Sequence, residues 1–285
     1  MRFRSIRTLP ILCVWMSMAG VGCASSYPKV DLTRENFTNV PARIELNVPF
    51  VEQTPELCGP TALYMVGKTL VPTLQLEAVK KLSFTPKAKG SFPQDMVSAT
   101  RRLHLQPYLV RSTTEIIDRL AMGSPIIIFH RTGFLWKDFW HYSVLTGYDL
   151  KSEKLVMHIG PYENRYANLS QVIGSWNEGG KWAFLIARGT DLPPGVLLQD
   201  ALDNALAFLR LGYTDDALFL SNEMLKRWPE RYEADVIKAQ ALLQNHQKSE
   251  AIAELKIGLK KEPQNERLKE KILEFSRSEK ADSME

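Results

Sequence analysis

The C-terminal third of the chain repeats at a fixed interval. Three pairs of small or turn-forming residues are 34 positions apart: Ala205 and Ala239, Ala217 and Ala251, and Pro229 and Pro263. Around them, segments 212–230 and 246–264 align without gaps. In a repeat of this length, each helix pair has an apolar face that only a neighbouring pair can cover. The period therefore predicts stacked helix pairs over 196–277, with a last helix near 266–276 and a tail at 278–285.

Small residues at the expected helix crossings, with a proline after the second helix, resemble tetratricopeptide repeats. The resemblance implies an all-α repeat domain over 196–277, and a protein of the envelope is the candidate partner of these repeats. A helical bundle without true repeats is the alternative, and the three coincident spacings favour repeats over it.

The N-terminus has the pattern of an export signal. Three arginines fall within the first seven residues, and the apolar run from Leu9 to Val21 is too short for a confident membrane span. Small residues precede Cys23, as in lipoprotein signals. We therefore expect cleavage after residue 22 and a lipid anchor on Cys23, with plain secretion as the alternative. Because Ala24 replaces the aspartate that marks inner-membrane retention, the predicted location is the outer membrane, facing the periplasm.

The charge balance excludes a nucleic-acid partner. The whole chain carries a formal net charge of +4, but residues 1–22 hold three of its positive charges and no negative ones. The exported chain is therefore close to neutral, at +1. A nucleic-acid-binding protein would need a concentrated basic face.

The remaining chain divides into a tether and a mixed domain. Residues 23–42 are polar and predict a tether, whereas 43–190 mix strand and helix patterns up to a break at Leu192–Gly195. Gly179 and Gly180, between Trp176 and Trp182, predict the turn of the last hairpin of a sheet.

Cys58 is the one thiol left after the signal and the lipid site are set aside. It follows an extended segment and a loop, and the residues from Pro60 onward have a helical apolar pattern. At a helix N-terminus, the dipole and free N–H groups stabilise a thiolate, so a lowered pKa is predicted for Cys58. Gly59 would let a substrate backbone approach closely. The alternative is a buried, inert thiol.

A nucleophilic thiol needs a base and a stabilised oxyanion. Gln53, five positions before Cys58, is a candidate oxyanion donor through its side-chain amide, together with the Cys58 backbone N–H. His130 ends one predicted core strand and His141 opens another, and the residues alone favour neither as the base. The aromatic segment 134–142 predicts either a hairpin packed on the core or the wall of a substrate groove.

Four segments together resemble the bacteriocin-processing peptidases, which cut leader peptides after a double glycine: 53–65, 123–130, 141–149 and 155–165. The resemblance covers about 46–187. It implies an α+β, papain-like cysteine peptidase fold in which a helix carrying the nucleophile packs on an antiparallel sheet. Residue by residue it implies Cys58 as nucleophile, His141 as base and Gln53 as oxyanion donor. The overall layout resembles lipoprotein peptidases with trailing tetratricopeptide repeats.

The chain departs from that family at one position. The family has an Asp-Pro pair after the strand that follows the catalytic histidine, and here the pair is Gly160-Pro161. The aspartate orients the imidazole. Our first candidate to replace it is His158, with Asn164 or a backbone carbonyl as alternatives. His158 as a hydrogen-bonded core histidine is an equal alternative.

The resulting hypothesis is a cysteine peptidase of the cell envelope that acts on a peptide or protein substrate. The alternative is a catalytically weak peptide-binding or assembly lipoprotein that uses the same groove and the helical repeats. The histidine and cysteine spacings match no zinc pattern, so no metal or cofactor is expected.

Overall fold

The computed structural model describes residues 27, 28, 30, 37, 39–134 and 137–282. The predicted export signal and the predicted lipid site at Cys23 lie outside these residues. Within them, no helix combines the length and the apolar character needed to cross a membrane.

One antiparallel sheet forms the centre of the first part of the chain. Its main path runs β2-β7-β3-β4-β5-β6, and β1 pairs with the far end of β4. The strands are β1 (Arg43–Glu45), β2 (Leu105–Leu109), β3 (Ile126–Phe134), β4 (Lys137–Asp149), β5 (Lys154–Ile159), β6 (Tyr162–Asn168) and β7 (Ala183–Arg188).

Helices cover both faces of this sheet and continue beyond it. They are α1 (Cys58–Leu70), α2 (Leu76–Ser83), α3 (Pro93–Arg102), α4 (Thr113–Ala121), α5 (Leu169–Glu178), α6 (Leu198–Leu211), α7 (Thr214–Arg227), α8 (Tyr232–Gln244), α9 (Lys248–Lys261) and α10 (Glu266–Asp282). Two 3-10 turns, η2 (Pro55–Leu57) and η3 (Pro86–Ala88), precede α1 and α3.

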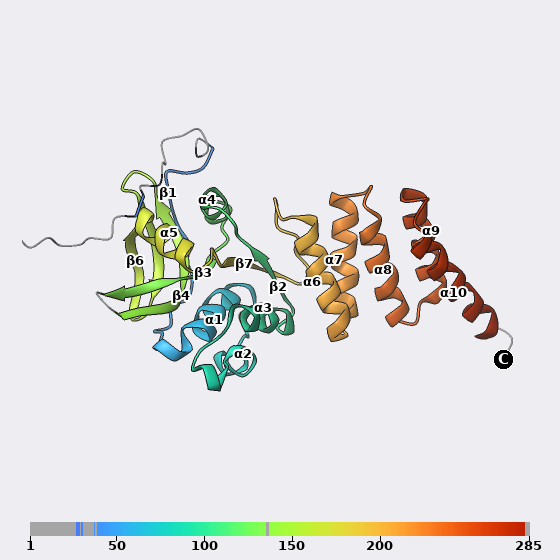
Figure 1. The fold of residues 1–285 in the computed structure, drawn as a ribbon, viewed down its shortest axis with the longest axis horizontal. Helices are drawn as coiled ribbons and strands as arrows, with labels where there is room; N and C mark the ends of the chain where they lie inside the picture. Colours follow the sequence, from blue (N-terminus) through green and yellow to red (C-terminus); the bar gives the residue numbers. More distant parts are fainter. Residues whose placement is uncertain (1–26, 29, 31–36, 38, 135–136, 283–285) are drawn as a thin grey trace, which may run out of the picture.

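The period-two alternation of the strands separates two apolar cores. Tyr142 and Val144 of β4 face α1 and α3, together with Cys58, whereas Leu145 belongs to the core under α4 and α5. A helix packed on an antiparallel sheet, followed by a run of five helices, is the fold class predicted from the sequence, and the structure confirms it (Figure 1).

The predicted hairpin around Gly179 and Gly180 is wrong, because the residues before it form α5. Asn168 caps this helix by accepting a hydrogen bond from the Gln171 N–H (3.1 Å). Gly180 then adopts a positive φ of 73° where the chain leaves the helix for β7. The glycines therefore end a helix, and Trp176 is a fully buried helix residue.

The 34-residue period appears in the helices themselves. The bounds of α8 and α9 equal those of α6 and α7 shifted by 34 residues, apart from the last residue of α8. Ala205, Ala217, Ala239 and Ala251 are all completely buried. The helices extend in a row away from the sheet, with α10 furthest from it (Figure 1). Because α10 continues to Asp282, most of the predicted tail at 278–285 is helical.

The row of helices is attached to the sheet domain through α6. Arg111 forms a two-pronged ion pair with Asp200 (2.7 and 2.9 Å). Buried Asn204 accepts a hydrogen bond from Arg101 Nε (2.9 Å) and donates one to Pro107 O (3.0 Å). One apolar core includes both the α4–α5 face of the sheet and α6, α7 and part of α8.

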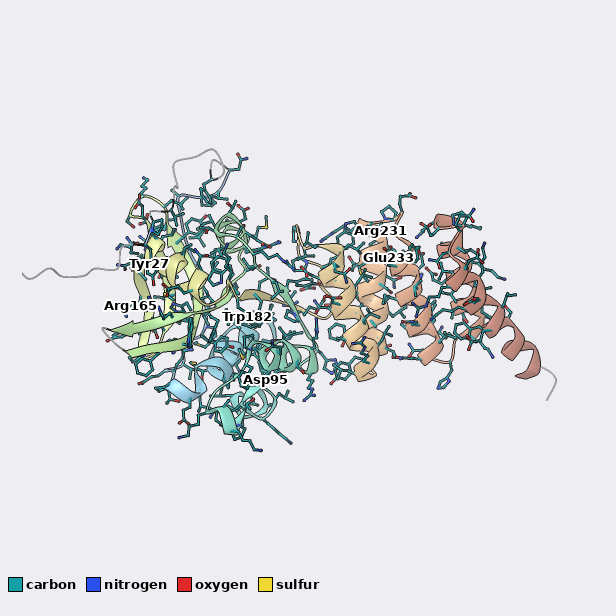
Figure 2. The ribbon with its side chains drawn as sticks, in the orientation of Figure 1. Tyr27, Asp95, Arg165, Trp182, Arg231 and Glu233 are labelled. Atoms are coloured by element: carbon teal, nitrogen blue, oxygen red, sulfur yellow. The ribbon has the colours of Figure 1, made fainter. Side chains whose placement is uncertain are left out.

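Residues of the predicted tether contact α5 where the structure describes them. The Tyr27 hydroxyl donates to the Glu178 carboxylate (3.0 Å), and the Val30 N–H donates to Ser170 Oγ (2.8 Å). Figure 2 labels Tyr27 on the side of the sheet that carries α5.

Candidate active site

Cys58 is the first residue of α1, as predicted, and it is 6% exposed. No side chain caps the start of this helix, so its first N–H groups depend on other partners. Cys58 is the one free cysteine among the described residues.

Two opposing effects set the pKa of the Cys58 thiol. Burial is the larger one and raises the pKa, whereas hydrogen bonds from the backbone amides of Tyr142, Gly59 and Cys58 lower it. The net change is upward. The prediction of a lowered pKa is therefore right about the helix-start amides and wrong about the balance, because the sequence does not reveal how little water reaches the sulfur.

Gly59 has a close neighbour in the loop between α2 and α3. A Cβ at this position would lie 2.9 Å from both Cβ and Oγ of Ser91 and 3.1 Å from Met96 Sδ. The Tyr142 hydroxyl donates to Ser91 O (3.1 Å), and Asp95 accepts from Thr85 Oγ1 (2.6 Å) and from the Phe92 N–H (3.2 Å). Figure 2 labels Asp95 in the first turn of α3. In this structure the groups that approach Gly59 closely are therefore the side chains of Ser91 and Met96.

Gln53 lies between the helix start and the sheet, with its side-chain amide fully hydrogen-bonded. Its Nε2 donates to Cys58 O and to Tyr142 O, both at 2.9 Å. Its Oε1 accepts from the Gly160 N–H (3.0 Å) and lies 3.1 Å from His141 Nε2. If the amide were rotated by 180°, its NH₂ group would face the Gly160 N–H, and its oxygen would face the carbonyl oxygens of Cys58 and Tyr142. The contacts therefore fix which end of the amide is oxygen and which is nitrogen.

His141 lies on β4, directly across from His130 of β3. Because Gln53 Oε1 can only accept, His141 Nε2 carries the proton of this bond and Nδ1 keeps its lone pair. Burial lowers the pKa of His141 to about 4, so the ring is neutral at pH 7. Within the described residues the Cys58 thiol and the His141 ring share no direct hydrogen bond, and Gln53 and Tyr142 connect them.

His130, the other candidate base, is held by two hydroxyl groups. Ser175 Oγ gives its proton to Val172 O (2.9 Å) and so accepts from His130 Nδ1 (3.2 Å), which leaves Nε2 to accept from Ser143 Oγ (2.9 Å). Burial lowers the pKa of His130 to about 3. Both ring nitrogens are therefore engaged, with hydroxyl groups of α5 and β4.

His158 is completely buried and also uses both of its ring nitrogens. Nε2 donates to Val48 O (3.0 Å), and Nδ1 accepts from the Asn164 N–H (3.1 Å). The Asn164 side chain accepts from Thr146 Oγ1 (3.1 Å). The structure therefore brings neither His158 nor Asn164 into a hydrogen bond with His141, and Gln53 takes the position beside the imidazole.

The aromatic segment before His141 forms part of the β3–β4 hairpin. Trp140 stacks on Phe129 (ring centroids 5.5 Å apart), and Phe129 contacts Tyr142 (4.6 Å). Trp182 packs edge-on against Tyr142 (5.7 Å), on the sheet face that carries α1 (Figure 2). The side chains of Trp140 and Phe139 are about half exposed beside the site.

Two contributors to this arrangement were missed in the sequence. Tyr142 supplies its amide to the thiol, its carbonyl to Gln53 and its hydroxyl to Ser91, and its place next to His141 was the available signal. Nothing in the sequence pointed to Ser91, whose Oγ is buried without a hydrogen-bond partner. No group of three or more potential metal-ligating side chains is present in the described part of the chain.

Comparison with known proteins identifies the domain. Residues 45–184 match the model of the Peptidase C39 like family, so this stretch is a Peptidase C39-like domain. The predicted resemblance to double-glycine leader peptidases is confirmed for this part of the chain. No curated protein matches.

Among solved structures, a putative C39-like peptidase from Bacillus anthracis is similar at 16% identity and a TM-score of 0.41, covering 51% of this chain and 98% of that one. The peptidase domain of Streptococcus ComA, described as a bi-functional ABC transporter involved in a quorum-sensing pathway, is similar at 20% identity and a TM-score of 0.40, with the same coverage.

Proposed function

We propose that the chain is a cysteine peptidase in which Cys58 is the nucleophile and His141 the general base. One observation carries the proposal: within a Peptidase C39-like domain, the uncapped helix start at Cys58 is joined through a single side chain, Gln53, to the imidazole of His141. A cysteine at a helix start with a histidine beside it is the arrangement that thiol acyl transfer requires.

The hydrogen bonds assign a role to each ring nitrogen. Nδ1 of His141 takes the proton from the Cys58 thiol, and the sulfur attacks the carbonyl carbon of the scissile peptide bond. The tetrahedral oxyanion accepts a hydrogen bond from the Cys58 backbone N–H, and it collapses as Nδ1 gives the proton to the leaving amine. Water, deprotonated by Nδ1, then hydrolyses the thioester and restores the thiol.

Burial has a consequence for when the thiolate forms. The raised pKa of Cys58 and the lowered pKa of His141 both favour the neutral pair in the free protein. Proton transfer therefore takes place together with attack on the substrate carbonyl, because the bound substrate supplies the electrophile. The predicted donation from Gln53 to the oxyanion would require one of its amide protons to leave Cys58 O or Tyr142 O.

Hydrolysis of a peptide library tests the function. Purified protein is incubated with peptides of diverse sequence, and new termini are identified by mass spectrometry. We expect a defined set of cleavages that disappears in Cys58→Ala and in His141→Ala. Cleavage that persists in Cys58→Ala, or its absence in all samples, would refute the proposal.

A peptide-binding module without turnover is the second candidate, favoured by the burial of Cys58 and by a cleft. The cleft, of about 470 Å³, runs between α3, β2 and α6, and its lining includes Pro93, Val97, Leu109, Trp182 and Leu211. Under this hypothesis the same library would contain peptides that bind Cys58→Ala and wild-type protein equally and are never cut.

We further propose that the chain is anchored at Cys23 in the cell envelope and that α6–α10 form tetratricopeptide-type repeats that dock an envelope protein. The support is the signal-like N-terminus and the 34-residue offset between the two helix pairs. Metabolic labelling with an alkyne fatty acid should mark the wild-type chain and leave Cys23→Ser unmarked and released from membranes. Equal labelling of both chains would contradict the anchor.

A further inference from the structure

Gln53 makes every hydrogen bond that a side-chain amide can make. Both protons are donated to backbone carbonyls, one on α1 and one on β4, and the oxygen accepts from Gly160 and from His141. The backbone of Gln53 is fixed as well, because its N–H donates to Gly160 O (3.0 Å). The side chain is 5% exposed, so water does not compete for these bonds.

The place of Gln53 in the sheet explains why one residue reaches all four partners. The β5 pairing with β4 extends from Asp149 back to Val144, where His158 is the partner, and the strand ends at Ile159. Beyond this point the edge of β4 at Tyr142 is free of β5. At this edge the Tyr142 carbonyl accepts from Gln53 and the Tyr142 amide contacts the Cys58 thiol. The Gln53 amide thereby links strand β4 to the start of α1 and to the turn at Gly160.

We infer that Gln53 is the positioning residue for His141, holding the imidazole as the Nε2–H tautomer through its carbonyl oxygen. Gly160 has no side chain for this task, and His158 and Asn164 are engaged elsewhere. With Nε2–H fixed on Gln53 Oε1, the lone pair of Nδ1 is the one available to accept the thiol proton. The inference rests on the proposed pairing of Cys58 with His141.

This role makes a different demand on the amide from that of an oxyanion donor. An oxyanion donor uses the N–H groups of Gln53 and acts only after a carbonyl has been attacked. A positioning residue uses Oε1 and acts earlier, on the proton transfer from thiol to imidazole. A reaction of Cys58 that creates no oxyanion therefore separates the two roles.

Alkylation by iodoacetamide is such a reaction. The Cys58 sulfur displaces iodide from a methylene carbon, the thiol proton goes to His141 Nδ1 or to solvent, and no tetrahedral oxyanion forms. Rates are measured from pH 5 to 9 on the full-length protein by mass spectrometry of the peptide that contains Cys58. We expect Gln53→Met to slow alkylation below pH 8 by about tenfold or more, to the level of His141→Ala.

Two further variants separate positioning from simple damage to the fold. Gln53→Glu keeps an acceptor for His141 Nε2 and should retain the His141-dependent pH profile that Gln53→Met loses. Gln106→Met is the matched control. Gln106 is also a buried glutamine, with Nε2 donating to Arg188 O (2.6 Å) and Asp191 O (2.9 Å) and Oε1 accepting from the Tyr108 hydroxyl. Gln106→Met should lower stability without changing the profile.

Each outcome decides a separate question. Wild-type kinetics in Gln53→Met, combined with lost peptide hydrolysis, would overturn the inference in favour of an oxyanion role. Equal slowing in Gln53→Met, Gln53→Glu and Gln106→Met would overturn it in favour of general destabilisation. If His141→Ala alkylates like wild type, the proposed Cys58–His141 pair itself fails. Slowing in Gln53→Met alone, with the Glu variant retaining the profile, supports the inference.

Discussion

The tightest contact around the nucleophile involves a residue without a side chain. Gly59 leaves just enough room for Ser91 and Met96, so a methyl group here would be overpacked. We predict that Gly59→Ala costs about 1–3 kcal/mol of unfolding free energy, measured by urea denaturation. Gly90→Ala, in the loop that carries Ser91, is the control, since its Cβ would meet nothing closer than 3.8 Å. Equal effects of the two substitutions would contradict this account of the contact.

Buried neutral histidines make the protein sensitive to acid. The folded-state pKa of His130 is about 3, against an ordinary value of 6.5, because burial disfavours the charged ring. Between these pH values the unfolded chain binds a proton that the folded chain does not, so stability rises with pH. The stabilisation is fully present above pH 6.5 and is lost as the pH falls towards 3.

His130→Gln tests this source of acid sensitivity. Glutamine can donate to Ser175 and accept from Ser143 without titrating, so we expect the melting temperature to fall less between pH 7 and 4.5 than in wild type. His246→Asn, at an exposed position, should follow the wild-type curve. A His130→Gln curve parallel to wild type would show that the acid sensitivity arises elsewhere.

For single residues, the sequence predicted positions along the chain better than it predicted contacts. The apolar pattern after Pro60 placed Cys58 at a helix start, because helix boundaries are local signals. The bond between Gln53 and His141 joins residues 88 positions apart and depends on where β5 ends. Burial of the thiol, which reverses the expected pKa change, likewise depends on packing across the whole domain.

Among the elements, α8 and α9 are joined by an ion pair inside the helical row. Lys261 Nζ donates to both carboxylate oxygens of Asp235 (2.8 and 2.6 Å), whose side chain is 1% exposed. Burial raises the pKa of Asp235 although Lys261 lowers it. The pair therefore offsets a desolvation cost that each partner alone would leave uncompensated.

Removing one partner of this pair should be strongly destabilising. We predict that Lys261→Met costs about 3–5 kcal/mol in urea denaturation, because it leaves a buried carboxylate unpaired. Lys226→Met, which breaks the exposed pair with Glu223, should change stability by about 0.5 kcal/mol or less. A cost for Lys261→Met no larger than that of the control would mean that Asp235 is protonated or hydrated in the folded protein.

Element types followed from the sequence where periodicity extended over many residues. The helix pairs at 34-residue spacing were predicted because each helix presents several turns of pattern. Helix α5 was mistaken for part of a hairpin because two glycines follow its ten residues, and glycines end helices as readily as they form turns. The point at which the pairing of β4 with β5 ends could not be predicted, since strand pairing is non-local.

For the molecule as a whole, we expect the core that the sheet shares with α6 and α7 to make the sheet domain and the helical row one cooperative unit. We predict that helix content and tryptophan fluorescence report one coincident thermal transition. Asn204→Ala should lower the unfolding free energy by about 1–3 kcal/mol, because it removes the hydrogen-bond partner of Arg101 and of Pro107 O. Both probes should then report the same lowered melting temperature. Two transitions, with only one displaced, would show that the parts unfold independently.

The boundaries of the apolar cores indicate which parts of the chain can be exchanged as units during evolution. The break in the core lies within the helical row: α6, α7 and part of α8 share a core with the sheet, whereas Ala239 and Leu242 of α8 join α9 and α10 in a separate cluster. In the sequence, Pro193-Pro194 has the pattern of a domain boundary. Exchanging everything after it would nevertheless remove α6 and α7, which share a core with the sheet. We therefore expect related chains to gain or lose whole repeats beyond α8, and substitutions in α6 to be matched by substitutions in β2.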